Sequence, residues 1–297
     1  MLIEKLEDWN RRPADLASID LLKKVLLGDP EYFRIEHAIN NHMVGADGSL
    51  NSVDTQLAQK EWNGLKAAYE KVGIETAVLP SNPELPDSCF TANPSMVIPL
   101  PLGGKEVWLA KMAHPSRQRE VPLHKEFFQK LGFPLRTMPK EVTRFEGCGD
   151  GILHPGRFCL HAGVGTRTSR KAWETIADAY PEMDILLYEL IHPDFYHLDT
   201  ALAPLNEDVA FFVPEAFHPD GIQFIEAAFP RAIALNREES MRFAGNAHCP
   251  DQKHVFMESG CPLAASKLPA LGMEAVTLET GEFRKSGGSV FCLKQSF

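Results

Sequence analysis

The chain has 297 residues, of which 44% are hydrophobic and 24% charged, a composition typical of a globular protein with a large core. Its 40 acidic and 30 basic residues give a formal net charge of −10, which disfavours nucleic acid and anionic membrane surfaces as partners. The expected ligand is a small molecule, and the excess of negative charge favours a cationic one.

Helical and strand-like segments alternate along the whole chain. The expected helices span residues 54–73, 115–132, 168–180, 218–228 and 262–272. Each is followed by a short apolar run that predicts a strand, in chain order ETAVLP, PLRTMP, DILLYEL, RAIALN and EAVTLE.

A turn-rich segment follows each of these strands and predicts a hairpin. In chain order these segments are CFTANPSMVIPL, FEGCGDGILHPGRFCLHAGV, HLDTALAPLNEDVAFFV, FAGNAHCPDQKHVFM and SGGSVFCL. An incomplete member, IEHAINNHMVG, precedes them near Asn41. The spacing is roughly 40 to 55 residues, a length typical of structural repeats.

Units of this kind close only as a ring or stack as a solenoid. For a single domain over residues 1–297 we favour the ring, a propeller-like α/β arrangement whose hairpin ends converge on the axis; a plain α/β sandwich is the alternative. In the ring, polar residues at the hairpin tips surround one pocket. They are Asp87, Asn93, Glu146, Asp150, His197, Asp199 and Cys292.

A cysteine, a histidine and carboxylates around one pocket form a nucleophile, a proton shuttle and a shell that positions a cationic planar group. Cys292 must attack as a thiolate, and His197 in YHLDT is its expected partner. If that segment is a strand, Asp199 lies on the same side as His197 and orients the imidazole or holds the substrate. Gly287 and Gly288 leave the approach to the sulfur open, because a substrate carbon must come within about 3.5 Å.

At these residues the chain resembles the guanidino-group-modifying enzymes of the pentein fold, which include arginine deiminases, dimethylarginine dimethylaminohydrolases, arginine dihydrolases and amidinotransferases. The motifs that carry the resemblance follow the family order over most of the chain: LPDSCFTANP, FEGCGDGI, GVGTRTS, YHLDTALAPL, FAGNAH and SGGSVFCL. The resemblance implies a five-fold pseudosymmetric α/β propeller with Cys292 as nucleophile and His197 as general acid and base.

The resemblance also implies the residues that hold the substrate. Glu146 and Asp87 would grip the guanidino or ureido nitrogens, and Arg167 would hold the α-carboxylate of an amino acid. EGCGD is one residue longer than the EGGD of the deiminases, so Glu146 rather than Asp150 is expected to make the direct contact. The remaining residues expected in the substrate pocket are Phe90, Asp150, Asp199 and Gly288, with Asn246 nearby.

One departure from the family pattern narrows the substrate. In the deiminases and dimethylaminohydrolases the position of Asn93 is usually an aspartate, whereas an amide both donates and accepts and suits a neutral ureido group as well as a guanidino group. This pattern resembles arginine dihydrolases and citrulline-hydrolysing relatives, which release ammonia on the way to ornithine. The alternatives are a dimethylarginine dimethylaminohydrolase, a citrulline-forming deiminase, an amidinotransferase and a pentein that binds amino acids without turning them over.

A zinc site is the rival of another class, because His248, Cys249, His254 and Cys261 lie close together in sequence. They lack any paired CxxC or HxxxH spacing, which disfavours zinc. The expected cysteine chemistry needs neither a metal nor an organic cofactor. No run of about 18 apolar residues occurs, the amino terminus MLIEKLEDWN is acidic, and six cysteines are too few for a disulfide scaffold. We therefore expect a cytoplasmic protein with no membrane or nucleic acid partner. The choice among arginine, citrulline, succinylarginine and methylated arginine stays open, as does assembly into a homo-oligomer.

Overall fold

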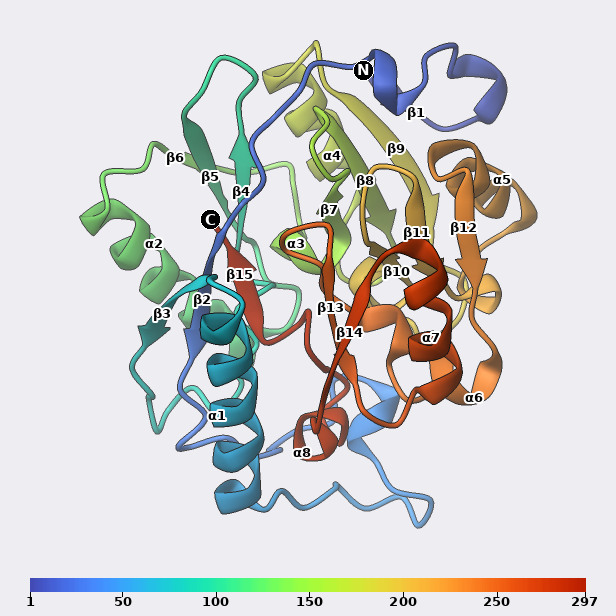
Figure 1. Cartoon of the computed structure of the whole chain (residues 1–297). Helices are drawn as coiled ribbons and strands as arrows, with labels where there is room; N and C mark the ends of the chain where they lie inside the picture. The colour runs from blue at the N-terminus through green and yellow to red at the C-terminus, as the bar shows by residue number, and fades with distance from the viewer.

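The computed structural model describes residues 1–297 and contains five small sheets arranged around a common centre (Figure 1). The strand orders are β15-β2-β3, β4-β5-β6, β1-β9-β8-β7, β10-β11-β12 and β13-β14. The strands are β1 Leu2–Ile3, β2 Lys24–Gly28, β3 Glu75–Leu79, β4 Ser95–Pro99, β5 Lys105–Leu109, β6 Leu135–Thr137, β7 Gly151–Leu153, β8 Cys159–Val164, β9 Asp184–Glu189, β10 Leu202–Pro204, β11 Val209–Phe212, β12 Arg231–Ala234, β13 His254–Glu258, β14 Glu274–Leu278 and β15 Lys294–Ser296. The helices are α1 Thr55–Lys71, α2 Val121–Lys130, α3 Gly147–Asp150, α4 Arg170–Ala179, α5 Pro219–Ala228, α6 Arg237–Ser240, α7 Pro262–Lys267 and α8 Gly281–Arg284.

Four of the five sheets repeat one pattern, and the fifth, β13-β14, keeps it without an inner strand. A middle strand pairs antiparallel with an inner strand and parallel with an outer strand, and a helix connects middle to outer as parallel pairing requires. The inner strands are β15, β4, β7 and β10; the middle strands are β2, β5, β8, β11 and β13; the outer strands are β3, β6, β9, β12 and β14. The connecting helices are α1, α2, α4, α5 and α7. Both the five expected helices and the five expected strands after them are therefore confirmed, and the ring rather than the sandwich is correct.

Two of the expected hairpins are wrong. In 243–257 the pairing shrinks to one antiparallel bridge between His248 and Phe256, because Pro250 cannot donate to a ladder and begins a turn. Residues 286–293 form turns, since the side-chain oxygen of Asn246 accepts the amides of Ser289, Phe291 and Cys292. Strand β15 then pairs with β2, so a strand near the C-terminus completes a sheet with strands from the first 80 residues.

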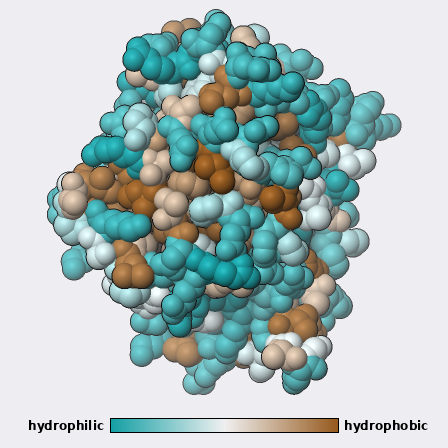
Figure 2. All heavy atoms as spheres, turned by 90° about the vertical axis from the view of Figure 1, so that its right-hand side faces the viewer, coloured by the Kyte–Doolittle hydropathy of each residue, from teal (hydrophilic) through white to brown (hydrophobic).

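Burial decreases from the axis outward. Every residue of β4, β10 and β15 is buried, whereas the outer strands β6, β12 and β14 are mostly half-buried or exposed. The connecting helices cover the sheets with an apolar stripe at helical spacing; in α1 it consists of Ala58, Trp62, Leu65 and Tyr69. None of the helices is both long and apolar enough to span a bilayer. The face in Figure 2 is largely hydrophilic, with hydrophobic side chains gathered in a band across its middle.

Candidate active site

The five segments that lead into the inner strands, or into the His248 bridge, meet on the ring axis. They contain Asn93, the Glu146–Asp150 segment, the His197–Asp199 segment, Asn246 and Cys292. Hydrogen bonds link each segment to the next in a closed circle: Ala92 amide to Cys292 carbonyl (3.2 Å), Cys148 amide to Ala92 carbonyl (2.9 Å), Leu198 amide to Asp150 carboxylate (3.0 Å), Asn246 side chain to Asp199 carbonyl (2.8 Å) and Phe291 amide to Asn246 carbonyl (3.0 Å). The topology therefore brings together residues as distant in sequence as Asn93 and Cys292.

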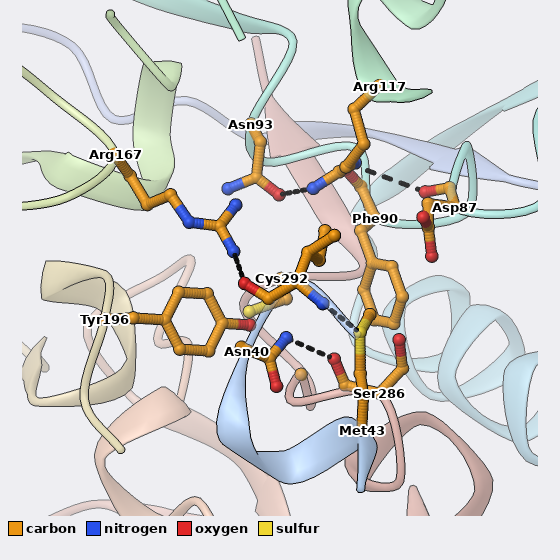
Figure 3. Close-up of a pocket in the computed structure, with 12 residues that line it drawn as sticks. Asn40, Met43, Asp87, Phe90, Asn93, Arg117, Arg167, Tyr196, Ser286 and Cys292 are labelled. Atoms are coloured by element: carbon orange, nitrogen blue, oxygen red, sulfur yellow. Dashed lines mark hydrogen bonds between the residues drawn. The ribbon is translucent and has the colours of Figure 1, made fainter. Parts of the chain in front are cut away.

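A cavity of about 300 Å³, counting its open mouth, lies at this meeting point (Figure 3). Its lining includes six residues expected from the sequence: Asp87, Phe90, Asn93, Arg167, Gly288 and Cys292. It also includes six that the sequence did not single out: Ile39, Asn40, Met43, Arg117, Tyr196 and Ser286. Glu146, Asp150, His197 and Asp199 are buried beneath this lining.

The sulfur of Cys292 is buried against a carboxyl group. Its thiol donates to Asp199 Oδ2 at 3.2 Å and accepts from Asn246 Nδ2 at 3.2 Å. Burial, and then the charge of Asp199, raise the pKa of the Cys292 thiol well above its ordinary value. Burial also raises the pKa of Asp199 to about 7. The thiol is therefore protonated in this arrangement, and only an added positive charge nearby would favour the thiolate.

The imidazole of His197 is held by Glu146. Their Nε2 and Oε2 atoms lie 2.7 Å apart, and Glu146 Oε1 accepts the amide of Ala113 at 2.8 Å. Burial alone would raise the pKa of Glu146, but the hydrogen bond and charge of His197, followed by the charge of Arg167, lower it to about 2. A fixed carboxylate anion thus orients the imidazole.

The segment YHLDT is not a strand, so the condition that would place Asp199 on the same side as His197 is not met. Residues Leu198–Thr200 form a 3₁₀ turn, because the Thr200 amide and hydroxyl both donate to the carbonyl of His197, at 3.2 and 2.7 Å. The turn directs Asp199 to the sulfur of Cys292, and Glu146 takes the place expected of Asp199 beside the imidazole.

Four buried polar atoms around the site lack a hydrogen-bond partner: Asp87 Oδ1, Asn93 Nδ2, Asp150 Oδ2 and Asp199 Oδ1. Asn93 is fixed in orientation because its Oδ1 accepts from Arg117 at 2.9 Å, which leaves the amide nitrogen free as a donor. Such unsatisfied groups are rare in protein interiors and favour a polar ligand. Burial raises the pKa of Asp87, and that of Asp150 to about 6.

Two arginines stand over the pocket, of which the sequence identified only Arg167. Arg167 contacts Glu146 at 3.3 Å, donates to the carbonyl of Ile39 and lies 4.9 Å from the ring centre of Tyr196. Arg117 donates to both oxygens of Glu120, at 2.9 and 2.7 Å, as well as to Asn93. Its segment, HPSRQRE, has the charge pattern of an exposed helix, so the sequence carried no signal of its burial.

The two glycines near the sulfur have a packing role. A Cβ on Gly288 would lie 2.6 Å from Cε1 of Phe90 and 3.0 Å from Cβ of Cys292. Gly287 has a φ of +87°, and a Cβ there would lie 2.7 Å from the side chain of Asn40. The absence of a Cβ at Gly288 and Gly287 therefore lets Phe90 and Asn40 pack close to the segment of Cys292. Gly288 also forms part of the cavity wall.

The residues considered as zinc ligands do not gather. His248 bonds to the hydroxyl of Tyr69 at 2.8 Å, and His254 bonds to Asp251 at 2.6 Å. No group of three or more His, Cys, Asp or Glu side chains is arranged to hold a metal ion.

In a comparison with known protein families, residues 29–293 match the family model described as N,N dimethylarginine dimethylhydrolase, eukaryotic. An uncharacterised protein of Caenorhabditis elegans, ZK1307.1, is 33% identical over 97% of this chain and 98% of its own length. The N(G),N(G)-dimethylarginine dimethylaminohydrolase of Mycobacterium tuberculosis is 31% identical over 91% of this chain and 84% of its own length. The bifunctional arginine dihydrolase/ornithine cyclodeaminase AgrE of Nostoc sp. is 29% identical over 91% of this chain, which spans only 37% of AgrE.

Among solved structures, the N-terminal domain of ArgZ, a cyanobacterial arginine dihydrolase, superposes with a TM-score of 0.84 and 26% identity. The match covers 93% of this chain and 98% of that domain, which was solved as a mutant bound to substrate. Another structure of the same domain, a variant, is covalently bonded to a reaction intermediate.

Proposed function

The chain belongs to the N,N dimethylarginine dimethylhydrolase family and is a hydrolase of amidino C–N bonds, and from this premise we propose that it hydrolyses arginine to ornithine with release of ammonia. The same matches confirm the resemblance to guanidino-modifying enzymes and the pentein fold. The proposed reaction runs through a covalent intermediate on Cys292, with His197 moving protons and Glu146 orienting His197.

The observation that carries this proposal is the free amide nitrogen of Asn93. A guanidinium presents only N–H groups, so the Asn93 donor has nothing to bind in it. A ureido group presents a carbonyl oxygen, which accepts a hydrogen bond. Because Asn93 Oδ1 is already taken by Arg117, the free donor suits a pocket that retains the ureido product for a second hydrolysis.

The charges of the pocket suit the two ends of an amino acid with a cationic side chain. Arg167 and Arg117 line the cavity and offer guanidinium donors to an α-carboxylate. The unpartnered oxygens of Asp87 and Asp199 accept from cationic nitrogens. Asp199 lies beside Cys292, so we place the guanidino group there and the α-amino group near Asp87.

The proposed chemistry begins when the bound guanidinium favours ionisation of Cys292 and Asp199. The sulfur attacks the guanidino carbon, and the tetrahedral adduct expels one nitrogen, which leaves as ammonia with a proton from His197. His197 then activates water, which attacks the thiouronium carbon, and the C–S bond breaks to return the thiolate and citrulline. A second cycle on the ureido group expels the second ammonia and leaves the carbamate of ornithine, which loses carbon dioxide, so that arginine and two waters give ornithine, two ammonia and carbon dioxide.

Product analysis tests this proposal. The protein is incubated separately with arginine, citrulline and asymmetric dimethylarginine, and ammonia, citrulline, ornithine and dimethylamine are measured. We expect ornithine from both arginine and citrulline. The alternative activity, suggested by the similarity to the Mycobacterium tuberculosis enzyme, would give dimethylamine and citrulline from dimethylarginine and no ornithine.

Two substitutions separate the parts of the proposal. Cys292→Ser should abolish turnover of every substrate while the protein stays folded. Asn93→Asp should shift the product from arginine toward citrulline, because a carboxylate repels the ureido oxygen and pairs with the guanidinium. An unchanged ratio of citrulline to ornithine would show that Asn93 does not set the product.

A further inference from the structure

A second cavity lies on the ring axis, at the other end of the inner strands from the catalytic pocket. The catalytic segments precede the inner strands, whereas this cavity is lined mainly by the inner strands, by the loops that follow them and by the segment before β2; it reaches the catalytic segments only at Cys148 and Phe291. All five units contribute: Val97 from β4, Leu153 from β7, Pro204 from β10, His248 from the bridge and Lys294 from β15. The cavity encloses about 670 Å³, counting its open mouth, and much of its wall is apolar.

The side chain of Lys294 is a buried cation of this cavity that forms no hydrogen bond or ion pair with the protein. Lys294 is 3% exposed, and its Nζ lies 3.3 Å from the ring centre of Phe291. No carboxylate, carbonyl or hydroxyl of the protein accepts a hydrogen bond from it. Lysine is almost never buried without a counter-charge, because the ammonium loses its hydration. The contact with Phe291 recovers part of that loss and leaves the three N–H donors unused.

Towards the catalytic segments, the charges of Asp199 and Cys292 oppose the lowering of the Lys294 pKa by burial, but neither group is bonded to Lys294, because they are hydrogen-bonded to each other. The titratable groups that line the cavity do not neutralise the charge of Lys294. His248 is neutral, since burial lowers its pKa and its two nitrogens contact Tyr69 and Ser296. Burial raises the pKa of the Cys148 thiol, and raises that of Cys249 to about 12, so both are protonated. Asp20 and His154 also line the cavity; Asp20 forms no ion pair with Lys294, and burial lowers the pKa of His154 to about 4.

We propose that this axial cavity is a binding site for a small aliphatic monocarboxylate, whose carboxylate pairs with Lys294 and whose hydrocarbon part lies against the apolar wall. One buried cation selects one negative charge, and the apolar lining of Ile152, Leu153, Val97 and Phe291 selects a hydrocarbon rather than a polar body. The site is separate from the catalytic pocket, whose lining shares no residue with it, so both sites can be occupied together.

Calorimetric titration of the full chain with butyrate and with butyramide at pH 7 tests the proposal. Butyrate should bind with one site per chain, and butyramide, which has the same shape without the charge, at least about tenfold more weakly. Lys294→Met should abolish butyrate binding, while Lys125→Met, an exposed lysine of α2, should not change it. Absence of saturable butyrate binding to the wild-type protein, or equal binding of butyramide, would overturn the proposal.

The catalytic arginines could also bind a carboxylate, so a third variant separates the two sites. Butyrate binding should persist in Arg167→Leu; loss there combined with persistence in Lys294→Met would assign the ligand to the catalytic pocket and overturn the proposal. A measurement without substitution covers the case in which Lys294→Met does not fold. Burial lowers the pKa of Lys294 to about 8, so the affinity of the wild-type protein should fall about tenfold per pH unit above that value. An affinity that is constant from pH 7 to 10 would contradict a role for Lys294.

Discussion

At the scale of single residues, we propose that Asp199 sets the reactivity of Cys292. The carboxyl accepts the thiol proton at 3.2 Å, and its charge raises the pKa of the sulfur in addition to burial. Replacing Asp199 by Asn removes that charge but keeps the size of the side chain. We expect the pH at which Cys292 reacts half-maximally with iodoacetamide to fall by about one unit or more, as measured by mass spectrometry of the labelled peptide.

The remaining cysteines provide the internal control for this labelling. Cys89 and Cys159 are buried away from Asp199, and their slow labelling should be the same in the Asp199→Asn variant and in the wild type. A Cys292 profile that stays in place or moves to higher pH would show that the carboxyl activates the thiol instead of holding its proton.

The same carboxyl makes stability depend on pH. Its pKa is about 7 in the folded protein and about 4 when unfolded, so the folded state binds more protons between these values. Stability contributed by the neutral form is full below pH 4 and is lost as the pH rises to about 7. In urea unfolding, the wild-type free energy of unfolding should fall from pH 5 to pH 8 by about 2 to 3 kcal/mol more than that of Asp199→Asn. Asp150 and Glu120, whose pKa values burial also raises, are common to both proteins and cancel; equal pH dependence would refute this assignment.

The sequence identified the functional candidates that lie next to glycines and predicted turns, such as Asn93 and Cys292. Residues of these types at such positions seldom serve only to fill the core. The sequence did not identify Arg117. Its guanidinium can be buried because Glu120 and Asn93 bond to it, and these three residues come together only in the folded chain. Reasoning from the sequence also misassigned the neighbour of His197, since the choice between Asp199 and Glu146 depends on a single 3₁₀ turn.

At the scale of elements, Gly288 permits the turn before β15 to pack against Phe90. An added Cβ would lie 2.6 Å from that ring, so Gly288→Ala should lower the free energy of unfolding by about 1 to 3 kcal/mol and reduce turnover. Gly64→Ala is the matched control: it lies exposed in α1 with no atom within 4 Å of the added Cβ. That change should stabilise the protein by up to about 1 kcal/mol through helix propensity, as measured by urea unfolding. If the two substitutions change the free energy of unfolding to a similar extent, close packing against Phe90 is not the reason for a glycine at position 288.

The connecting helices and outer strands were predictable because each depends on a local pattern, as with the stripe of α1 and its cap at Asp54, which accepts the amides of Gln56 and Leu57. The last inner strand was not. β15 has three residues and its partner β2 lies at the opposite end of the chain, a pairing on which local periodicity carries no information.

At the scale of the whole molecule, the ring is closed by that one pairing. Inner strands position the catalytic segments at one end of the axis, so the placement of Cys292 relative to Asn93 depends on β15 being held against β2. The C-terminal Phe297 adds to the closure, since it is 6% exposed and packs against Phe127, Phe128 and Phe133.

Removal of residues 294–297 therefore tests whether the ring acts as one unit. The deletion leaves every proposed catalytic side chain in place but removes the three pairings of β15 and the buried ring of Phe297. We expect the midpoint of thermal unfolding to fall by about 10 °C or more, and turnover to be lost even at temperatures where the protein is folded by circular dichroism. Removal of residues 1–4 is the control, because β1 is an edge strand beside β9 and takes no part in closing the ring. That deletion should lower the unfolding midpoint by less and preserve turnover. Turnover retained without residues 294–297 would mean that the hydrogen bonds among the catalytic segments hold the site together without closure of the ring.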